Sequence, residues 1–214
     1  MTADNAIGVD VALVLAIDSS GSISNEWITL QIQGHVDALR HRRFIEAVQA
    51  GPLGRVAATF VEWSDRDRQD QVAGWTIIHD LASAQSFAQA IAEAPHPVPG
   101  VTSISGAIDF SAKLIAGSGY DATRRVIDIS GNGSNNDGRP VTEARDAAWA
   151  AGITINGLPI LDVEPALNAY YRDNVIVGLG AFIVVARDMS SFSTAVQRKL
   201  LFEVAGLSPP KDDA

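Results

Sequence analysis

The sequence predicts an α/β protein with three layers, α/β/α, built on a doubly wound, mostly parallel sheet. Two observations indicate this fold class. Short apolar runs rich in β-branched residues, such as residues 9–17, have the composition of strands that are buried on both faces. These runs alternate with segments whose apolar residues recur at helical spacing, as expected when helices connect parallel strands and cover both faces of their sheet.

The first half of the chain supplies the opening strand, a long helix and a pair of strands. Asn25 is expected to cap a helix that begins at Glu26, and Gly51-Pro52 is expected to end it. Residues 55–63 and 71–78 are predicted strands. The polar stretch between them is short enough for a hairpin, so this pair should be antiparallel.

The second half alternates helices and strands more regularly. Apolar spacing predicts helices over 84–94, 103–116, 142–151, 163–171 and 192–204, and strands over 125–130, 153–160 and 180–186. Ligands of such sheets bind outside the carboxyl ends of the strands. We therefore expect function to reside in the loops that follow the strands.

Composition and charge indicate one globular domain over residues 1–214, with a core at about 8–206 and a flexible tail at 207–214. Hydrophobic residues make up 47% of the chain, which argues against disorder. The 16 Lys and Arg against 25 Asp and Glu give a net charge of -9, so we expect no nucleic-acid partner. The basic cluster at residues 40–43 lies where the first helix is expected to end, where cations complement the helix dipole.

The chain contains no cysteine, which excludes disulfides and thiolate chemistry. No apolar run reaches the roughly 18 residues of a membrane span, so we expect no direct membrane insertion. The start at Met1 lacks the pattern of a signal peptide. It is also what a chain would show after removal of one, and in that case a periplasmic or secreted location is favoured.

The loop Asp18-Ser19-Ser20-Gly21-Ser22 is the strongest functional signal. It follows the first predicted strand and places one carboxylate and two hydroxyls, at Asp18, Ser20 and Ser22, before a helix. These are the hard oxygen ligands that Mg²⁺, Ca²⁺ or Mn²⁺ prefers. A structural alternative is that Asp18 and Ser22 cap the first helix, as Asp and Ser often do.

In this loop the sequence resembles the von Willebrand factor A family, whose metal-ion-dependent adhesion site contains Asp-x-Ser-x-Ser, a later Thr and a third-loop Asp. The resemblance implies that Asp18, Ser20, Ser22 and Thr102 are metal ligands. It also implies a six-stranded sheet with one antiparallel edge strand. The third loop departs from the pattern, because Asn132 stands where the family commonly has Asp. Asp137 is a possible substitute ligand.

Three further segments, at residues 124–131, 152–160 and 199–203, resemble an uncharacterised bacterial family of von Willebrand A-like proteins. Members of that family often look exported, which again favours a periplasmic or secreted location. No activity is assigned to them. The resemblance therefore implies a fold and a site but no substrate.

The leading functional expectation is a protein-binding module that uses a cation, Mg²⁺ or else Ca²⁺ or Mn²⁺, to hold an acidic side chain of a partner protein. A structural subunit with a degenerate metal site is the first alternative, and a metal-assisted hydrolase is the second. We expect no enzyme and name no catalytic residue, because the sequence lacks the Gly-x-Ser-x-Gly and Walker-type patterns of common hydrolases.

Overall fold

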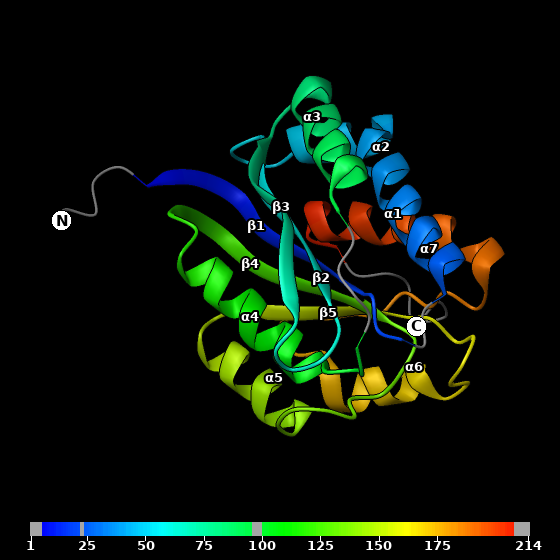
Figure 1. Cartoon of the computed structure of the whole chain (residues 1–214). Helices are drawn as coiled ribbons and strands as arrows, with labels where there is room; N and C mark the ends of the chain where they lie inside the picture. The colour runs from blue at the N-terminus through cyan, green and yellow to red at the C-terminus, as the bar shows by residue number, and fades with distance from the viewer. Residues whose placement is uncertain (1–5, 22–23, 96–99, 208–214) are drawn as a thin grey trace.

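The computed structural model describes residues 6–21, 24–95 and 100–207. A sheet of order β3-β2-β1-β4-β5 forms its middle layer (Figure 1). The strands are β1 (Ile7–Asp18), β2 (Val56–Trp63), β3 (Gln69–Ile78), β4 (Tyr120–Gly131) and β5 (Thr154–Pro159). β1 pairs in parallel with β2 and β4, and β4 with β5, whereas β3 is an antiparallel edge strand. The predicted fold class and the antiparallel edge are confirmed.

Two helical layers cover the faces of this sheet (Figure 1). One contains α1 (Asn25–Arg40), α2 (Arg42–Gln49), α3 (Leu81–Glu93) and α7 (Met189–Ala205). The other contains α4 (Ile104–Ala116), α5 (Val141–Ala150), α6 (Leu167–Tyr170) and the π-helical turn η1 (Tyr171–Val175). β1 is buried between them, with Leu13 and Leu15 in the first core and Val14 and Ala16 in the second. Its alternating side chains thus tie both layers to one strand.

The prediction of a sixth strand at residues 180–186 is wrong. This segment runs beside β5 but makes only isolated parallel bridges, Gly157 with Ile183 and Ile160 with Ala186. The backbone N–H of Phe182 donates to the side-chain oxygen of Asn156 at 3.0 Å. A side chain thus takes the place of a backbone partner, and the ladder is not continuous.

The prediction of one helix from residue 26 to Gly51 is also wrong. His41 has an extended backbone, with φ -72° and ψ 134°, and separates α1 from α2. Its Nδ1 accepts a hydrogen bond from the Arg43 N–H at 3.2 Å and so caps α2. The basic cluster at residues 40–43 therefore lies at a helix junction. The N-cap of α1 is Ser24, not Asn25, because the Ser24 hydroxyl accepts from the Trp27 N–H.

The short helix expected over residues 163–171 begins later, at Leu167, and continues as η1 to Val175. This shift leaves residues 160–166 as a loop that follows β5 at the carboxyl end of the sheet. The expected loop at 95–100 and the tail at 207–214 fall largely outside the described residues.

Candidate functional site

The candidate site lies where β1 and β4 end, at the carboxyl edge of the parallel sheet. Asp18 is the last residue of β1, and Asn132 directly follows β4. Thr102 comes from the loop before α4. The structure thus brings residues from three predicted loops to one edge, at the place where α/β sheets of this kind bind ligands.

Asp18 is completely buried and only half of its carboxylate is satisfied by the protein. Oδ1 accepts a hydrogen bond from the Ser20 N–H at 2.7 Å, and the Asn132 backbone N–H also bonds to the carboxylate. Oδ2 has no hydrogen-bond partner among the described residues. Burial raises the pKa of Asp18 to about 6, against these hydrogen bonds, which lower it.

Ser20 and Thr102 bring two hydroxyls together beside Asp18. The Thr102 hydroxyl lies 3.4 Å from the Ser20 hydroxyl, and both residues are buried. Backbone bonds hold the two loops in place, since the Gly21 N–H donates to the Gly100 carbonyl at 2.7 Å. A Cβ at Gly21 would lie 3.3 Å from that carbonyl oxygen, so a glycine suits the close approach. Ser22, the fourth predicted ligand, lies outside the described residues.

Asn132 is fully buried next to Asp18, to which its backbone N–H donates. A Cβ at the following Gly133 would lie 3.8 Å from the Thr102 hydroxyl. The loop after β4 therefore contacts both of the other loops. The sequence places an amide where the family pattern has a carboxylate, so of the predicted ligands gathered here only Asp18 carries a charge.

Asp137, the suggested substitute ligand, is engaged elsewhere. Its carboxylate accepts from the Arg66 backbone N–H at 2.8 Å and pairs with the Arg66 guanidinium at 2.8 Å. The backbone hydrogen bond from Arg66 is the largest of the effects that lower the pKa of Asp137. Its main chain remains close to the site, because the Asp137 N–H donates to the Thr102 carbonyl at 3.2 Å.

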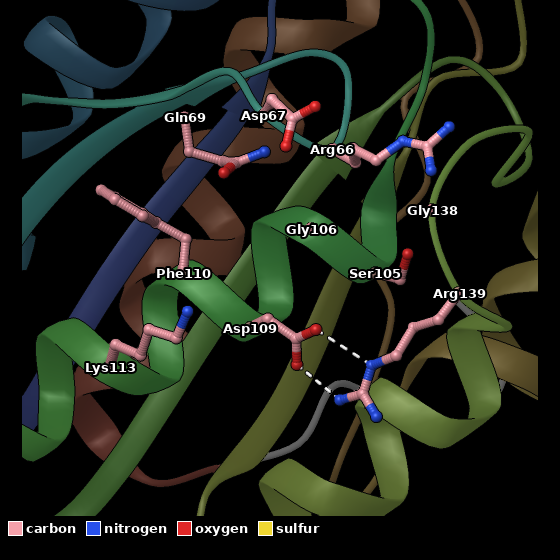
Figure 2. Close-up of a pocket in the computed structure, with 10 residues that line it drawn as sticks. All are labelled: Arg66, Asp67, Gln69, Ser105, Gly106, Asp109, Phe110, Lys113, Gly138 and Arg139. Carbon is pink, nitrogen blue, oxygen red and sulfur yellow. Dashed lines mark hydrogen bonds and ion pairs between the residues drawn. The ribbon is translucent and has the colours of Figure 1, made fainter.

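A polar pocket of about 280 Å³ adjoins the loop that carries Asp137 (Figure 2). Asp109 of α4 and Arg139 form an ion pair across its lower side, with Arg139 Nε 2.9 Å from the carboxylate. Arg66 points away from that pair in the same view. The two ion pairs, Arg66–Asp137 and Arg139–Asp109, therefore hold residues 137–139 against neighbouring elements.

Three residues that the sequence reasoning missed surround the site. The charge of Asp162, in the loop after β5, raises the pKa of Asp18. Glu164, in the same loop, accepts from the Ser134 N–H at 2.9 Å and the Ser134 hydroxyl at 2.6 Å. Tyr171 is buried with its hydroxyl unpaired among the described residues. Of these three residues, only Asp162 had a recognisable sequence pattern, a carboxylate that closely follows a predicted buried strand.

No group of three or more His, Cys, Asp or Glu side chains within residues 6–21, 24–95 and 100–207 is arranged to hold a metal ion. A cation site here therefore depends on hydroxyl and amide oxygens as well as carboxylates. In the same ranges, no helix is both long and apolar enough to cross a membrane.

A family model described as "Protein of unknown function (DUF1194)" matches residues 8–208. The search of curated proteins finds no match. The resemblance to an uncharacterised family is thereby confirmed over nearly the whole chain.

Solved structures with similar folds are von Willebrand factor A proteins. A von Willebrand factor type A protein from Catenulispora acidiphila matches with a TM-score of 0.66 at 13% identity. The match covers 93% of this chain and 43% of the Catenulispora chain. Proximal thread matrix protein 1 from the mussel byssus, with a zinc-occupied MIDAS motif, has a TM-score of 0.61 at 16% identity, covering 92% and 46%. The chain thus spans less than half of either protein.

The vWF domain of the type V pili tip protein Mfa5 from Porphyromonas gingivalis matches over its whole length. Its TM-score is 0.61 at 12% identity, and the match covers 96% of this chain and 99% of that domain. At these identities the likeness shows the fold, and the fold is that of a von Willebrand factor A domain.

Proposed function

This chain belongs to the DUF1194 family and has the von Willebrand factor A fold, and on that basis we propose that it is a single-domain module that binds a protein partner through a divalent cation. The observation that carries the proposal is the state of Asp18. A carboxylate oxygen that is buried without a hydrogen-bond partner is costly, and a bound cation would offset that cost.

The residues at the carboxyl edge of the sheet suit a hard cation. Asp18, Ser20 and Thr102 offer carboxylate and hydroxyl oxygens within one buried cluster, and Asn132 and Ser22 are the further ligands we assign. Oxygen ligands of this kind favour Mg²⁺, or Ca²⁺ or Mn²⁺, over softer ions. When bound, the cation would supply an open coordination position for an acidic side chain of the partner.

The surroundings of the site favour contact with another protein. Val101 and Val163, on two of the loops that surround Asp18, are 53% and 58% exposed. Exposed apolar side chains beside the site offer surface that a bound partner protein can remove from water. The zinc-occupied MIDAS motif of the mussel protein and the pilus origin of Mfa5 support an adhesive, exported role, which we extend to this chain. We assign it no catalytic residue.

Calorimetric titration of the whole chain with MgCl₂, CaCl₂ and MnCl₂ tests the proposal. We expect one site per chain and a rise in the unfolding temperature with cation concentration. Asp18→Ala should abolish both effects. Asp121→Asn is the matched control, because Asp121 is an exposed residue near the opposite end of β4.

Two results would contradict the proposal. A wild-type chain that binds none of the three cations would favour a structural subunit with a degenerate site. Cation-dependent hydrolysis of model esters or phosphoesters that Asp18→Ala abolishes would favour a metal-assisted hydrolase.

A further inference from the structure

We infer that Asp162, on the loop after β5, supplies the second negative charge of the cation site, in place of the carboxylate that Asn132 lacks. This inference rests on the proposed function and assigns a residue to the same site. Two hydrogen-bonded anchors between the loops, the register of β4 and β5, and the charges around the site support it.

Two anchors hold the loops after β4 and β5 side by side. At the sheet edge, the Ile160 N–H donates to the Gly131 carbonyl at 2.9 Å. Farther along, Ser134 bonds to the Glu164 carboxylate through its N–H and its hydroxyl, at 2.9 and 2.6 Å. Asn132 and Asp162 lie between these anchors, one and two residues beyond the first.

The register of β4 and β5 keeps the two residues on adjacent loops. Neighbouring strands lie about 4.8 Å apart, and Gly131 pairs with Pro159, so Asn132 leaves the sheet opposite Ile160, two residues before Asp162 in the adjacent loop. Asn132 itself bonds to Asp18 through its N–H. A carboxylate at position 162 thus starts on the loop next to the candidate ligands, from which it could reach a cation directly or through one bound water.

The charges near the site are unbalanced without a cation. The Asp162 carboxylate lies close enough to the buried Asp18 carboxylate for the two charges to interact. Within the described residues, no Lys, Arg or His forms an ion pair with either carboxylate, whereas Arg66 neutralises Asp137. A divalent ion would balance the charges of these two carboxylates.

Asp162 is also free to take this role. Its side chain is exposed, and no hydrogen bond or ion pair holds it among the described residues. Glu164, by contrast, is committed to Ser134. Glu164 therefore positions the loop, and Asp162 contributes the charge.

Titration with MnCl₂ and MgCl₂, each metal alone, tests the assignment on the full chain. We expect Asp162→Asn to weaken binding about tenfold, since a unit charge at roughly 6 Å from a divalent ion contributes about this much even in a watery environment. Asp137→Asn should bind within about twofold of the wild type, because it removes a charge that Arg66 already neutralises. Asn132→Asp should restore affinity in the Asp162→Asn background.

The unfolding temperature, measured in EDTA and again with excess Mn²⁺, gives a second test. Substitution of a residue with only a structural role would change the unfolding temperature in the same direction under both conditions. Removing the charge beside Asp18 should leave the metal-free Asp162→Asn protein as stable as the wild type or more stable. Its stability with excess Mn²⁺ should be lower. The sign of the effect therefore reverses on cation binding.

The outcomes separate the two proposals. The assignment of Asp162 would be overturned if the wild type and Asp162→Asn bound Mn²⁺ equally well and Asp18→Ala did not bind it. The proposed cation site would remain in that case. A larger loss from Asp137→Asn than from Asp162→Asn would overturn it too. A wild-type chain that binds no cation would overturn the proposed function, and this inference with it.

Discussion

The Tyr171 hydroxyl and the Asp18 carboxylate approach the same point beside Gly131. A Cβ at Gly131 would lie 2.9 Å from Asp18 Oδ2 and 3.0 Å from the Tyr171 hydroxyl oxygen. Both oxygens are buried, and neither has a hydrogen-bond partner among the described residues. Burial raises the pKa of Tyr171 well above its usual range, so the hydroxyl stays protonated. The side chains of Asp18 and Tyr171 fill the space that a Cβ at position 131 would need. A glycine at the end of β4 therefore fits this arrangement.

Gly131→Ala should destabilise the protein by about 1–3 kcal/mol, the usual cost of overpacking a filled interior. The added methyl group would push against Asp18 and Tyr171 at once. Urea unfolding measures the change. Gly74→Ala is the control, because a Cβ at Gly74 meets no atom within 4 Å. Equal stability of the two variants would contradict this interpretation of Gly131.

Asp18→Asn should stabilise the cation-free protein at pH 7.5 by about 3 kcal/mol while abolishing cation binding. The reason is that burial raises the pKa of Asp18 from 3.8 to about 6, and a rise of one in a pKa corresponds to about 1.4 kcal/mol. The amide is isosteric with the carboxylate and avoids a buried charge. Urea unfolding in EDTA measures the difference from the wild type.

The stabilisation by Asp18→Asn should depend on pH in a defined window. A carboxyl whose pKa is raised in the folded state favours folding below pH 3.8, and this contribution is lost as the pH rises through about 6. The two proteins should therefore have nearly equal stability at pH 4 and diverge up to about pH 7. A constant difference across this range would show that the Asp18 pKa is not raised.

Thr102→Val should leave the cation-free fold within about 1 kcal/mol of the wild type, because among the described residues the Thr102 hydroxyl makes only one long contact, of 3.4 Å with the Ser20 hydroxyl. Cation affinity should fall at least about tenfold, since valine keeps the shape and removes a ligand oxygen. Titration with MgCl₂ measures the affinity. Unchanged affinity would remove Thr102 from the proposed site.

The sequence was sufficient for most of the fold and for the core of the candidate site. Strand composition and helical spacing are local properties, and they placed Asp18, Ser20 and Thr102 in two loops, each before a helix, that the structure brings together. The missing sixth strand depends on tertiary contacts instead. The Asn156 side chain that replaces a ladder partner is an example, since no local pattern encodes that pairing.

The part of the site formed by the loop after β5 was missed for a similar reason. Asp137 was closer to Asn132 in sequence, so it was the natural substitute for the missing carboxylate. Its partner Arg66 lies 71 residues away, and the Ser134–Glu164 contact spans 30 residues. Only the folded arrangement shows that Arg66 pairs with Asp137 and that Ser134 and Glu164 join the loops after β4 and β5.

A buried ion-pair network under the sheet allows a final prediction about stability. Lys199 of α7 is 1% exposed and lies 2.9 Å from the Asp128 carboxylate of β4 and 2.6 Å from the Glu203 carboxylate. The Asn156 amide donates to the other Glu203 oxygen at 2.7 Å. This network attaches the closing helix to two strands of the sheet.

Lys199→Met should destabilise the protein by about 3–5 kcal/mol, because it leaves two buried carboxylates without their cation. Arg42→Met removes another i,i+4 ion pair, with Glu46, whose side chains are 89% and 54% exposed, and should cost less than about 1 kcal/mol. Urea unfolding at pH 7.5 compares them. Similar losses in both variants would mean that the buried network adds no more to stability than a surface pair, and that α7 is held by its apolar face alone.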